Sequence, residues 1–221
     1  MSGPRQFNRK GHFEDNRIVQ LHSNAIKKEL PKSKGWVVSK NINLTFDQVE
    51  RLELKALLKS YETKFDLWGW KDPRAVLFLK CWKEIVPDLK VLMVWRSIDE
   101  VIASLIKRSI LSESKNTKIN LFDAIKTWQV YNEKIIEFHR AFPEDSMVVP
   151  LQEIIDGQDE LLSQISKKFG FSLELNCIQG VYEEQLLSSR KKSYLVLLPK
   201  VRKISQELND ISFGINCRTQ Y

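Results

Sequence analysis

The stretch from Trp68 to Ser104, WGWKDPRAVLFLKCWKEIVPDLKVLMVWRSIDEVIAS, decides the fold that we expect for this chain. Residues 90–95 within it, KVLMVW, form a short apolar run that is rich in residues common in β-strands. Pro87 and Asp88 precede the run and a helix signal follows it, a setting typical of a buried parallel strand. The sequence therefore predicts a buried parallel strand at residues 90–95.

A helix start follows this strand directly. Ser97 and Glu100 have the spacing of a capping box, in which the side chain of each residue bonds the backbone N–H of the other. The apolar residues recur at helical spacing, at Ile98, Val101, Ile102 and Leu105. We therefore expect a helix that begins after Ser97, with Ser104 at the edge of its apolar stripe and on the same side as Ser97.

Arg96 lies between the expected strand and the expected helix. Open α/β sheets bind ligands at the carboxyl ends of their strands, and the planar donors of an arginine can grip two phosphate oxygens at once. Arg96 is therefore a candidate for binding a phosphate, and Ser104 could add a hydroxyl donor to the same anion. The alternative is that Arg96 pairs with a carboxylate and Ser104 packs as a small residue. The spacing alone favours this alternative.

Apolar periodicity and breaking residues predict the remaining elements. We expect helices at residues 15–30, 45–61, 72–86, 121–140, 158–169 and 199–209, and short strands at residues 65–70 and 147–149. Thr45 and Gln48 should form the capping box of the second helix, and Gly170 should end the helix at residues 158–169. Strands that alternate with helices predict a parallel sheet covered on both faces.

Three blocks in this order resemble the sulfotransferases that use 3′-phosphoadenylyl sulfate (PAPS). In that family an apolar strand ends in an arginine, and a serine eight residues later completes the site for the 3′-phosphate, positions matched here by Arg96 and Ser104. Residues 68–74, WGWKDPR, resemble a block of the bacterial members, and residues 128–132, WQVYN, resemble their W-x-x-Y-N helix. The resemblance extends over residues 8–190, and it favours the phosphate-binding interpretation of Arg96 over the alternative.

The resemblance implies an α/β fold in a single sulfotransferase-like domain, residues 1–221. This fold is a P-loop-like three-layer sandwich with a parallel sheet. The family opens with a strand, a loop of the type PKSGTT that wraps the 5′-phosphosulfate, and a helix. Nothing before Gly11 provides this unit, so we expect the fold to lack its first β–loop–α unit. Residues 31–36, PKSKGW, imitate the loop but follow a helix end; we interpret them as a helix-breaking loop, with phosphate binding as the minority alternative.

The unit that we expect to be missing includes a strand that is central in the family's sheet. Without that strand, residues 90–95 would lack a neighbour on one side. An unpaired apolar edge invites pairing with another chain. We therefore expect self-association of this chain.

Sulfuryl transfer needs a base for the acceptor hydroxyl, a cation on the leaving oxygen and a grip on the nucleotide. The resemblance makes Glu14 the candidate base, and the alternative is an acidic residue that favours a helix start. His12 is the rival base, and its alternative is a solvated loop histidine. Lys71 matches a lysine that stabilises the transferring group, and its alternative is a salt bridge to Asp72 or another neighbour.

A basic loop, SSRKKS, occupies residues 188–193. A late basic loop clasps the 3′-phosphate of the nucleotide in the family, so the resemblance assigns Arg190 and Lys191 to cofactor binding. A basic run is more often simply solvated, and this alternative stays open.

Length and composition fit one soluble globular domain, because the chain has 221 residues, of which 43% are hydrophobic and 29% charged. The net charge of +7 fits an anionic ligand such as a nucleotide, although nucleic acid or an anionic membrane surface would fit it equally well. Three scattered cysteines, no signal-peptide core and no run long enough to span a membrane predict a reducing, cytoplasmic location. No cysteine or histidine has metal-ligand spacing.

The function implied by the resemblance is transfer of a sulfuryl group from PAPS, the co-substrate, to a hydroxyl or amine of a small-molecule or glycan acceptor, without a metal. An alternative is a truncated, inactive relative that acts as a nucleotide-binding or interaction module. A basic nucleic-acid-binding domain ranks last, because the sequence carries no nucleic-acid motif.

Overall fold

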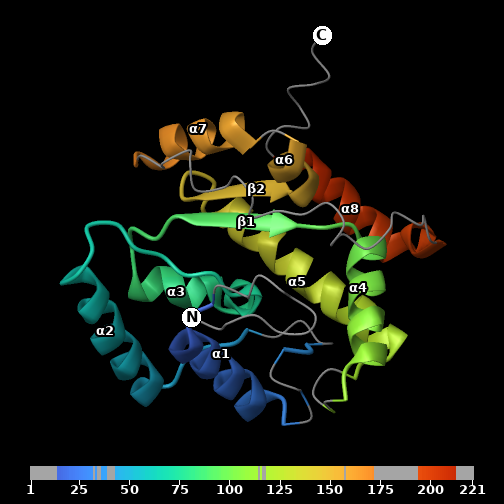
Figure 1. Cartoon of the computed structure of the whole chain (residues 1–221), viewed down its shortest axis with the longest axis horizontal. Coiled ribbons are helices and arrows are strands. Elements are labelled where there is room, and N and C mark those ends of the chain that lie inside the picture. Colours follow the sequence, from blue (N-terminus) through green and yellow to red (C-terminus); the bar gives the residue numbers. More distant parts are fainter. Residues whose placement is uncertain are drawn as a thin grey trace. The chain divides into compact units, whose positions relative to one another are not determined.

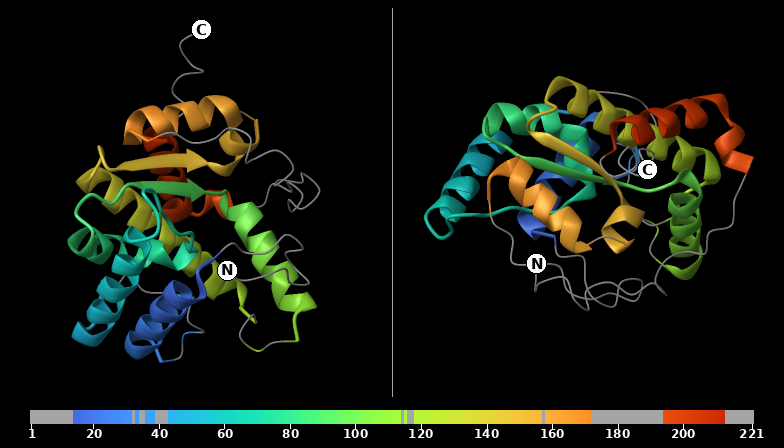
Figure 2. Two further views of the ribbon diagram at one scale, coloured as in Figure 1. Left: turned by 60° about the vertical axis from the view of Figure 1, so that its left-hand side comes forward. Right: turned by 90° about the horizontal axis from the view of Figure 1, so that it is seen from above.

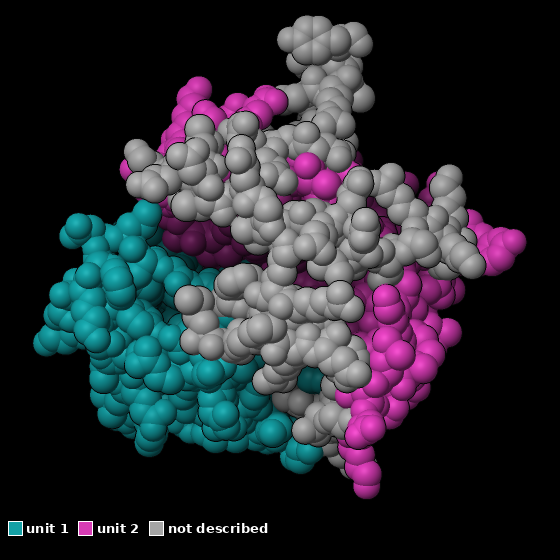
Figure 3. All heavy atoms as spheres, in the orientation of Figure 1, with its two compact units in different colours: residues 1–89 teal, residues 90–221 magenta. Residues whose placement is uncertain are grey.

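The structure is a computed structural model that describes residues 14–31, 33, 36–38, 43–113, 115, 118–156, 158–171 and 194–212. The chain divides into two compact units, residues 1–89 and residues 90–221 (Figure 1, Figure 3). Each unit is described below by itself. A single domain over residues 1–221 stays a prediction.

The first unit is helical in its described part. Its elements are α1 (Asn16–Glu29), α2 (Gln48–Glu62), the 3₁₀ helix η1 (Pro73–Phe78) and α3 (Leu79–Ile85). Asp15, Asp47 and Asp72 cap the first three of these helices by accepting a hydrogen bond from a backbone N–H group. The helix predicted at residues 15–30 is confirmed, and the one predicted from Asp72 opens as a 3₁₀ helix before α3 continues it.

The capping box predicted for the second helix is wrong by two residues. The N-cap is Asp47, not Thr45. Asp47 Oδ1 accepts from the Glu50 N–H at 2.8 Å, and Glu50 Oε2 accepts from the Asp47 N–H at 2.9 Å. Both pairs have capping-box spacing, but two carboxylates at the helix start also interact favourably with the helix dipole. This electrostatic advantage explains why the helix begins at Gln48.

The strand predicted at residues 65–70 is also wrong. These residues are irregular chain after α2, and Phe65 and Leu67 are more than half exposed. A strand requires a neighbouring strand to bond its backbone, and the described part of the first unit contains none. The aromatic residues of this segment pack as rings instead, because Trp68 lies 5.4 Å from Tyr61 and 5.9 Å from Trp70 between ring centroids.

The second unit contains two strands and several helices in its described part. These elements are β1 (Val91–Trp95), α4 (Ile98–Leu111), α5 (Leu121–Ala141), β2 (Ser146–Pro150), α6 (Leu151–Asp156), α7 (Gln158–Phe169), the 3₁₀ helix η5 (Tyr194–Leu197) and α8 (Pro199–Ile211). The two strands pair in parallel, with Val91 opposite Ser146 and Trp95 opposite Pro150. The mixed α/β class with a parallel sheet is therefore confirmed. The sheet has two strands among the described residues, not the three predicted.

Helices lie on both faces of the two strands of this unit. Figure 2 shows α6 and α7 on one side of β1 and β2 and α5 and α8 on the other. On the first face, Met147 and Val149 of β2 pack against Leu161 and Ile165 of α7. On β1, alternate side chains differ in burial, because Met93 and Trp95 are buried whereas Leu92 and Val94 are about 40% exposed. The parallel strand predicted at residues 90–95 is confirmed, but its burial is only partial, because one face of β1 is exposed within the described residues.

The helix ends in this unit follow the local signals. The capping box of Ser97 and Glu100 is present at the start of α4. The helix α7 ends at Phe169, and Gly170 follows it with a φ of 74°, the left-handed conformation that glycine adopts without strain. No helix in the described part of the chain is long and apolar enough to cross a bilayer.

Candidate functional site

Arg96 follows the last residue of β1 and precedes the N-cap of α4. Its guanidinium Nε and Nη2 atoms are buried and have no hydrogen-bond partner among the residues that the structure describes. Nearly all buried polar atoms in proteins are paired, so two orphaned donors on one cation are unusual. The alternative predicted for Arg96, pairing with a carboxylate, is not seen within the described residues. Unpaired, buried donor atoms on a half-buried arginine are suited to an anion.

The backbone around Arg96 is held from the neighbouring helix. Trp128 Nε1 on α5 donates a hydrogen bond to the backbone oxygen of Arg96 at 3.0 Å. This bond ties the carboxyl end of β1 to the WQVYN segment that carries the resemblance. Trp128 is 3% exposed and is therefore a core residue that also positions Arg96.

Ser97 caps α4 at the strand–helix junction, and Ser104 lies about two turns further along the same helix. The Ser97 hydroxyl accepts from the Glu100 N–H at 3.4 Å, and Glu100 Oε2 in turn accepts from the Ser97 N–H at 3.2 Å. The half-buried Ser104 follows on α4, and no hydrogen bond of its hydroxyl is found in the part of the chain described. The structure thus keeps Arg96 and Ser104 in one unit, on adjoining elements.

A second group of charged residues lies in the first unit. Lys71 Nζ donates to Glu14 Oε1 at 3.1 Å, and Arg74 Nη2 lies 3.7 Å from Glu14 Oε2. The Glu14 side chain is 11% exposed whereas that of Lys71 is 58% exposed. The structure therefore brings the two predicted catalytic residues Glu14 and Lys71 together. It also shows the salt bridge that was the alternative for Lys71, with Glu14 as the partner and not Asp72.

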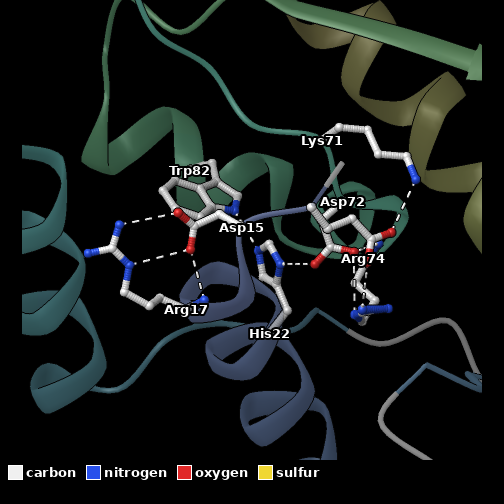
Figure 4. Close-up of polar contacts among 8 residues, drawn as sticks. Asp15, Arg17, His22, Lys71, Asp72, Arg74 and Trp82 are labelled. Carbon is white, nitrogen blue, oxygen red and sulfur yellow. Dashed lines mark hydrogen bonds and ion pairs between the residues drawn. The ribbon is translucent and has the colours of Figure 1, made fainter. Parts of the chain in front are cut away.

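The start of α1 is clamped immediately after Glu14. The Tyr61 hydroxyl donates to Asp15 Oδ2 at 2.5 Å. Arg17 Nη2 donates to the same oxygen at 3.2 Å (Figure 4). Burial would raise the pKa of Asp15, but the hydrogen bonds from Tyr61 and Arg17 outweigh it and lower that pKa to about 2. This clamp fixes the backbone on which Glu14 sits.

A buried histidine–aspartate pair supports the charged group. His22 on α1 is fully buried, its Nδ1 lies 2.7 Å from Asp72 Oδ2, and its Nε2 accepts from Trp82 Nε1 at 2.8 Å (Figure 4). An indole N–H can only donate, so Nε2 carries the lone pair and Nδ1–H donates to Asp72. Burial lowers the pKa of His22 even though Asp72 acts to raise it, and the ring is therefore neutral near pH 7.

The partners of His22 exclude a direct chemical role for it. Both ring nitrogens are occupied, and the ring packs against Phe78 and Phe46 at 4.9 and 5.7 Å between centroids. A catalytic histidine needs one nitrogen within reach of the substrate. His22 therefore positions Asp72 and does not exchange protons with a substrate.

Asp72 links the buried His22 to the charged residues nearer the surface. Its Oδ1 accepts from the Arg74 N–H at 3.0 Å and lies 3.3 Å from Arg74 Nε, an ion pair that falls outside hydrogen-bonding geometry. Burial would raise the pKa of Asp72, but the His22 hydrogen bond and the charge of Arg74 hold it below its usual value. The order of contacts from core to surface is Trp82, His22, Asp72, Arg74, Glu14 and Lys71.

Sequence reasoning missed His22, although a signal for it exists. His22 lies four residues after Ile18 and four before Ile26, on the apolar stripe of its helix. A histidine on such a stripe has to find partners inside the core. His12, Arg190 and Lys191 lie outside the described residues, and their predicted roles stay predictions.

Comparisons of the chain with models of protein families, with curated proteins and with solved structures find no match in any of the three. In the part of the chain described, no group of three or more histidine, cysteine or acidic side chains is placed to hold a metal ion. Of the predicted site residues that the structure describes, Arg96 in the second unit and Lys71 in the first carry a positive charge.

Proposed function

We propose that this chain is a PAPS-dependent sulfotransferase that transfers a sulfuryl group to a hydroxyl or amine acceptor. The observation that carries the proposal is the pair of buried, unpaired guanidinium nitrogens of Arg96 at the carboxyl end of β1. The sequence blocks that resemble the family give these donors a ligand, the 3′-phosphate of the nucleotide. Helices on both faces of β1 and β2 support the proposal of a three-layer, P-loop-like fold.

The proposed reaction forms one bond to sulfur and breaks another. The acceptor oxygen or nitrogen attacks the sulfur of PAPS, and the bond from sulfur to the bridging oxygen of the phosphosulfate breaks. The acceptor proton passes to a base, and 3′-phosphoadenosine 5′-phosphate leaves. In this scheme Glu14 is the base and Lys71 stabilises the charge that develops on the bridging oxygen.

The Glu14–Lys71 ion pair is compatible with these roles. The Lys71 side chain is 58% exposed, so its ammonium group can leave Glu14 for a phosphosulfate without losing packing. Only the Lys71 end of this pair is exposed, and Arg74 remains 3.7 Å from Glu14 when Lys71 leaves. Exchange of the Lys71 contact for the substrate would free one oxygen of Glu14 to accept the proton.

Isothermal titration with 3′-phosphoadenosine 5′-phosphate tests the nucleotide site. We expect the wild-type chain to bind the nucleotide and Arg96→Ala to weaken binding by roughly tenfold to a hundredfold, since a hydrogen bond to a charged group contributes about 1.5–3 kcal/mol. Arg202→Ala is the matched control, because it removes the same charge from an exposed position of α8 in the same unit. Absence of heat with the wild type, or equal affinity of Arg96→Ala and wild type, would contradict the proposal.

One observation favours the second candidate function, a nucleotide-binding module without transfer activity. Both carboxylate oxygens of Glu14 lie beside a cation, Lys71 on one side and Arg74 on the other. A base held in this way has no free oxygen unless an ion pair opens. Incubation with radiolabelled PAPS and a panel of hydroxyl and amine acceptors separates the two, because a module binds the nucleotide and releases no labelled product.

A further inference from the structure

A run of exposed apolar residues precedes α8. Tyr194, Val196, Leu197 and Leu198 are 87%, 41%, 69% and 42% exposed. The backbone of this run is not loose, because η5 packs against both α4 and α8; Figure 2 shows it at the outer end of α8. Soluble proteins seldom expose several apolar side chains in succession unless the surface has a partner.

Cations stand directly beside this run. Lys200, Arg202 and Lys203 are exposed and lie in the first five residues of α8, whose first turn contains no acidic residue. Cations at the N-terminal end of a helix oppose the helix dipole and are locally unfavourable. The helix dipole therefore does not account for their placement, whereas ion pairs or attraction to an external anionic surface do.

Nearby carboxylates neutralise only part of this charge. Lys200 Nζ lies 2.7 Å from Glu133 Oε1, and Lys203 Nζ lies 3.9 Å from Glu207 Oε1. Arg202 makes no ion pair within the described residues. Three cations against two carboxylates leave the surface around η5 positive.

We propose that residues 194–203 form a docking surface for a lipid bilayer that carries anionic headgroups. A bilayer offers an anionic surface and an apolar interior only a few ångströms apart, which matches cations placed beside an apolar tip. Tyr194 and Leu197 enter the boundary between headgroups and acyl chains, and Arg202 and Lys203 remain among the phosphates. The contact is interfacial, and it goes beyond the proposed function because neither Arg96 nor Lys71 takes part.

Charge disfavours a second copy of the chain as the occupant. The chain carries a net charge of +7. In a two-fold contact through this surface, the same patch would face itself and Arg202 would approach its own copy. Like charges brought together in this way repel.

The test measures binding of the full chain to sucrose-loaded vesicles of phosphatidylcholine, with or without phosphatidylserine, by cosedimentation. We expect binding to the phosphatidylserine vesicles that weakens with added salt. Tyr194→Ser combined with Leu197→Ser should lower the partition coefficient tenfold or more, on the order expected for two apolar side chains. Arg202→Glu should lower it at least about fivefold, since each cation near the surface contributes roughly that factor.

Matched control variants are available on α2. Val49 and Leu52 are each 63% exposed, so Val49→Ser combined with Leu52→Ser removes exposed apolar surface at another place. Lys55→Glu makes the same charge change as Arg202→Glu at another exposed position. Both controls should bind vesicles as the wild type does. Circular dichroism of every variant verifies folding, and Leu197→Trp, which adds an interfacial aromatic residue, should raise binding several-fold.

Three outcomes would overturn the proposal. The first is no sedimentation of the wild type with either kind of vesicle. The second is equal binding by the wild type and by the double serine variant at residues 194 and 197. The third is a dimer in light scattering that this double variant converts to a monomer, without vesicle binding, because that result assigns the surface to a second copy of the chain.

Discussion

Trp82 Nε1 donates a hydrogen bond at 2.8 Å to Nε2 of His22, and this bond fixes which nitrogen of the buried histidine carries the proton. Protonation of Nε2 would set two donors against each other inside the core. The folded protein therefore holds His22 neutral, and Nδ1–H is directed to Asp72. The two bonds connect the aromatic core of the first unit to the charged residues at its surface.

This relationship predicts a loss of stability in mild acid. The pKa of His22 lies below its usual 6.5 in the folded state, so the unfolded chain binds a proton first as pH falls. Stability should be full above about pH 6.5 and should fall below it, by up to about 1.4 kcal/mol per pH unit, until the lowered pKa is reached. Urea unfolding measured between pH 7 and pH 5 tests this expectation.

The variant His22→Gln should lack that loss and should be less stable than the wild type at pH 7. His139→Gln is the necessary comparison, because burial also lowers the pKa of His139 and it titrates in the same range. An acid loss that disappears only in His139→Gln would show that His22 is not its source.

Replacing the indole donor should weaken the first unit. Trp82→Phe leaves His22 Nε2 buried without a donor, which costs about 1–3 kcal/mol in addition to the lost ring contacts. It should also raise the pKa of His22, because the nitrogen becomes free to bind a proton. Histidine NMR titration and urea unfolding measure the two effects. Trp70→Phe is the control, because the Trp70 ring packs on Trp82 at 4.4 Å between ring centroids and does not bond His22. The pKa of His22 should not change in this variant.

Removing the charge of Asp72 should cost more than removing an exposed one. The Asp72 side chain is 1% exposed and that of Arg74 is 17% exposed, so Asp72→Asn removes the nearer carboxylate of a largely buried cation and leaves only Glu14 at 3.7 Å. We expect a loss of about 3 kcal/mol in the free energy of unfolding at pH 7. The wild type should lose this contribution as pH falls below about 3.8, because the pKa of Asp72 is lowered in the folded state.

The control for Asp72→Asn is Asp47→Asn. Asp47 is half exposed and caps α2, and asparagine caps a helix about as well as aspartate. A clearly smaller loss than for Asp72→Asn is expected there. Equal losses for the two variants would mean that burial of the Asp72–Arg74 pair does not decide the cost.

Lys71→Met separates a catalytic lysine from a structural one. The side chain is 58% exposed and its ion pair with Glu14 is near the surface, so unfolding stability should change by less than about 1 kcal/mol. Sulfuryl transfer should fall by roughly a hundredfold or more if Lys71 stabilises the leaving oxygen, as expected for loss of a group that acts on transition-state charge. Lys64→Met, at an exposed position of the same unit, should change neither quantity. Unchanged transfer in Lys71→Met would remove Lys71 from the mechanism.

Local signals predicted the elements that local interactions decide. The capping box of Ser97, the strand at residues 90–95 and the end of α7 before Gly170 agree with the structure. Each depends on residues within one turn or one strand, where dihedral preference and hydrogen bonding act over a few positions. The wrong strand at residues 65–70 shows the limit, because a strand forms only where a neighbour can bond its backbone.

For the candidate site too, local patterns predicted single residues but not the contacts between them. Arg96 was found from its place between an apolar run and a capping box, and Glu14 and Lys71 were found from blocks that resemble a family. Their contact at 3.1 Å joins residues 57 positions apart in the chain. No local pattern predicts such a contact, and His22 escaped notice because its importance depends on Asp72 and Trp82, which are equally remote in sequence.

The sequence by itself determined the long helices, the parallel strand β1 and the position of Arg96 at its end. Apolar periodicity and helix capping, which predict these features, depend on residues that are close in sequence. Only the tertiary structure decided which polar atoms found partners. Trp82 and Asp72 occupy both nitrogens of His22, whereas two nitrogens of Arg96 remain buried and unpaired. Burial removes the water that would otherwise satisfy such groups. Whether a buried polar group finds a partner therefore depends on neighbours that only folding brings together.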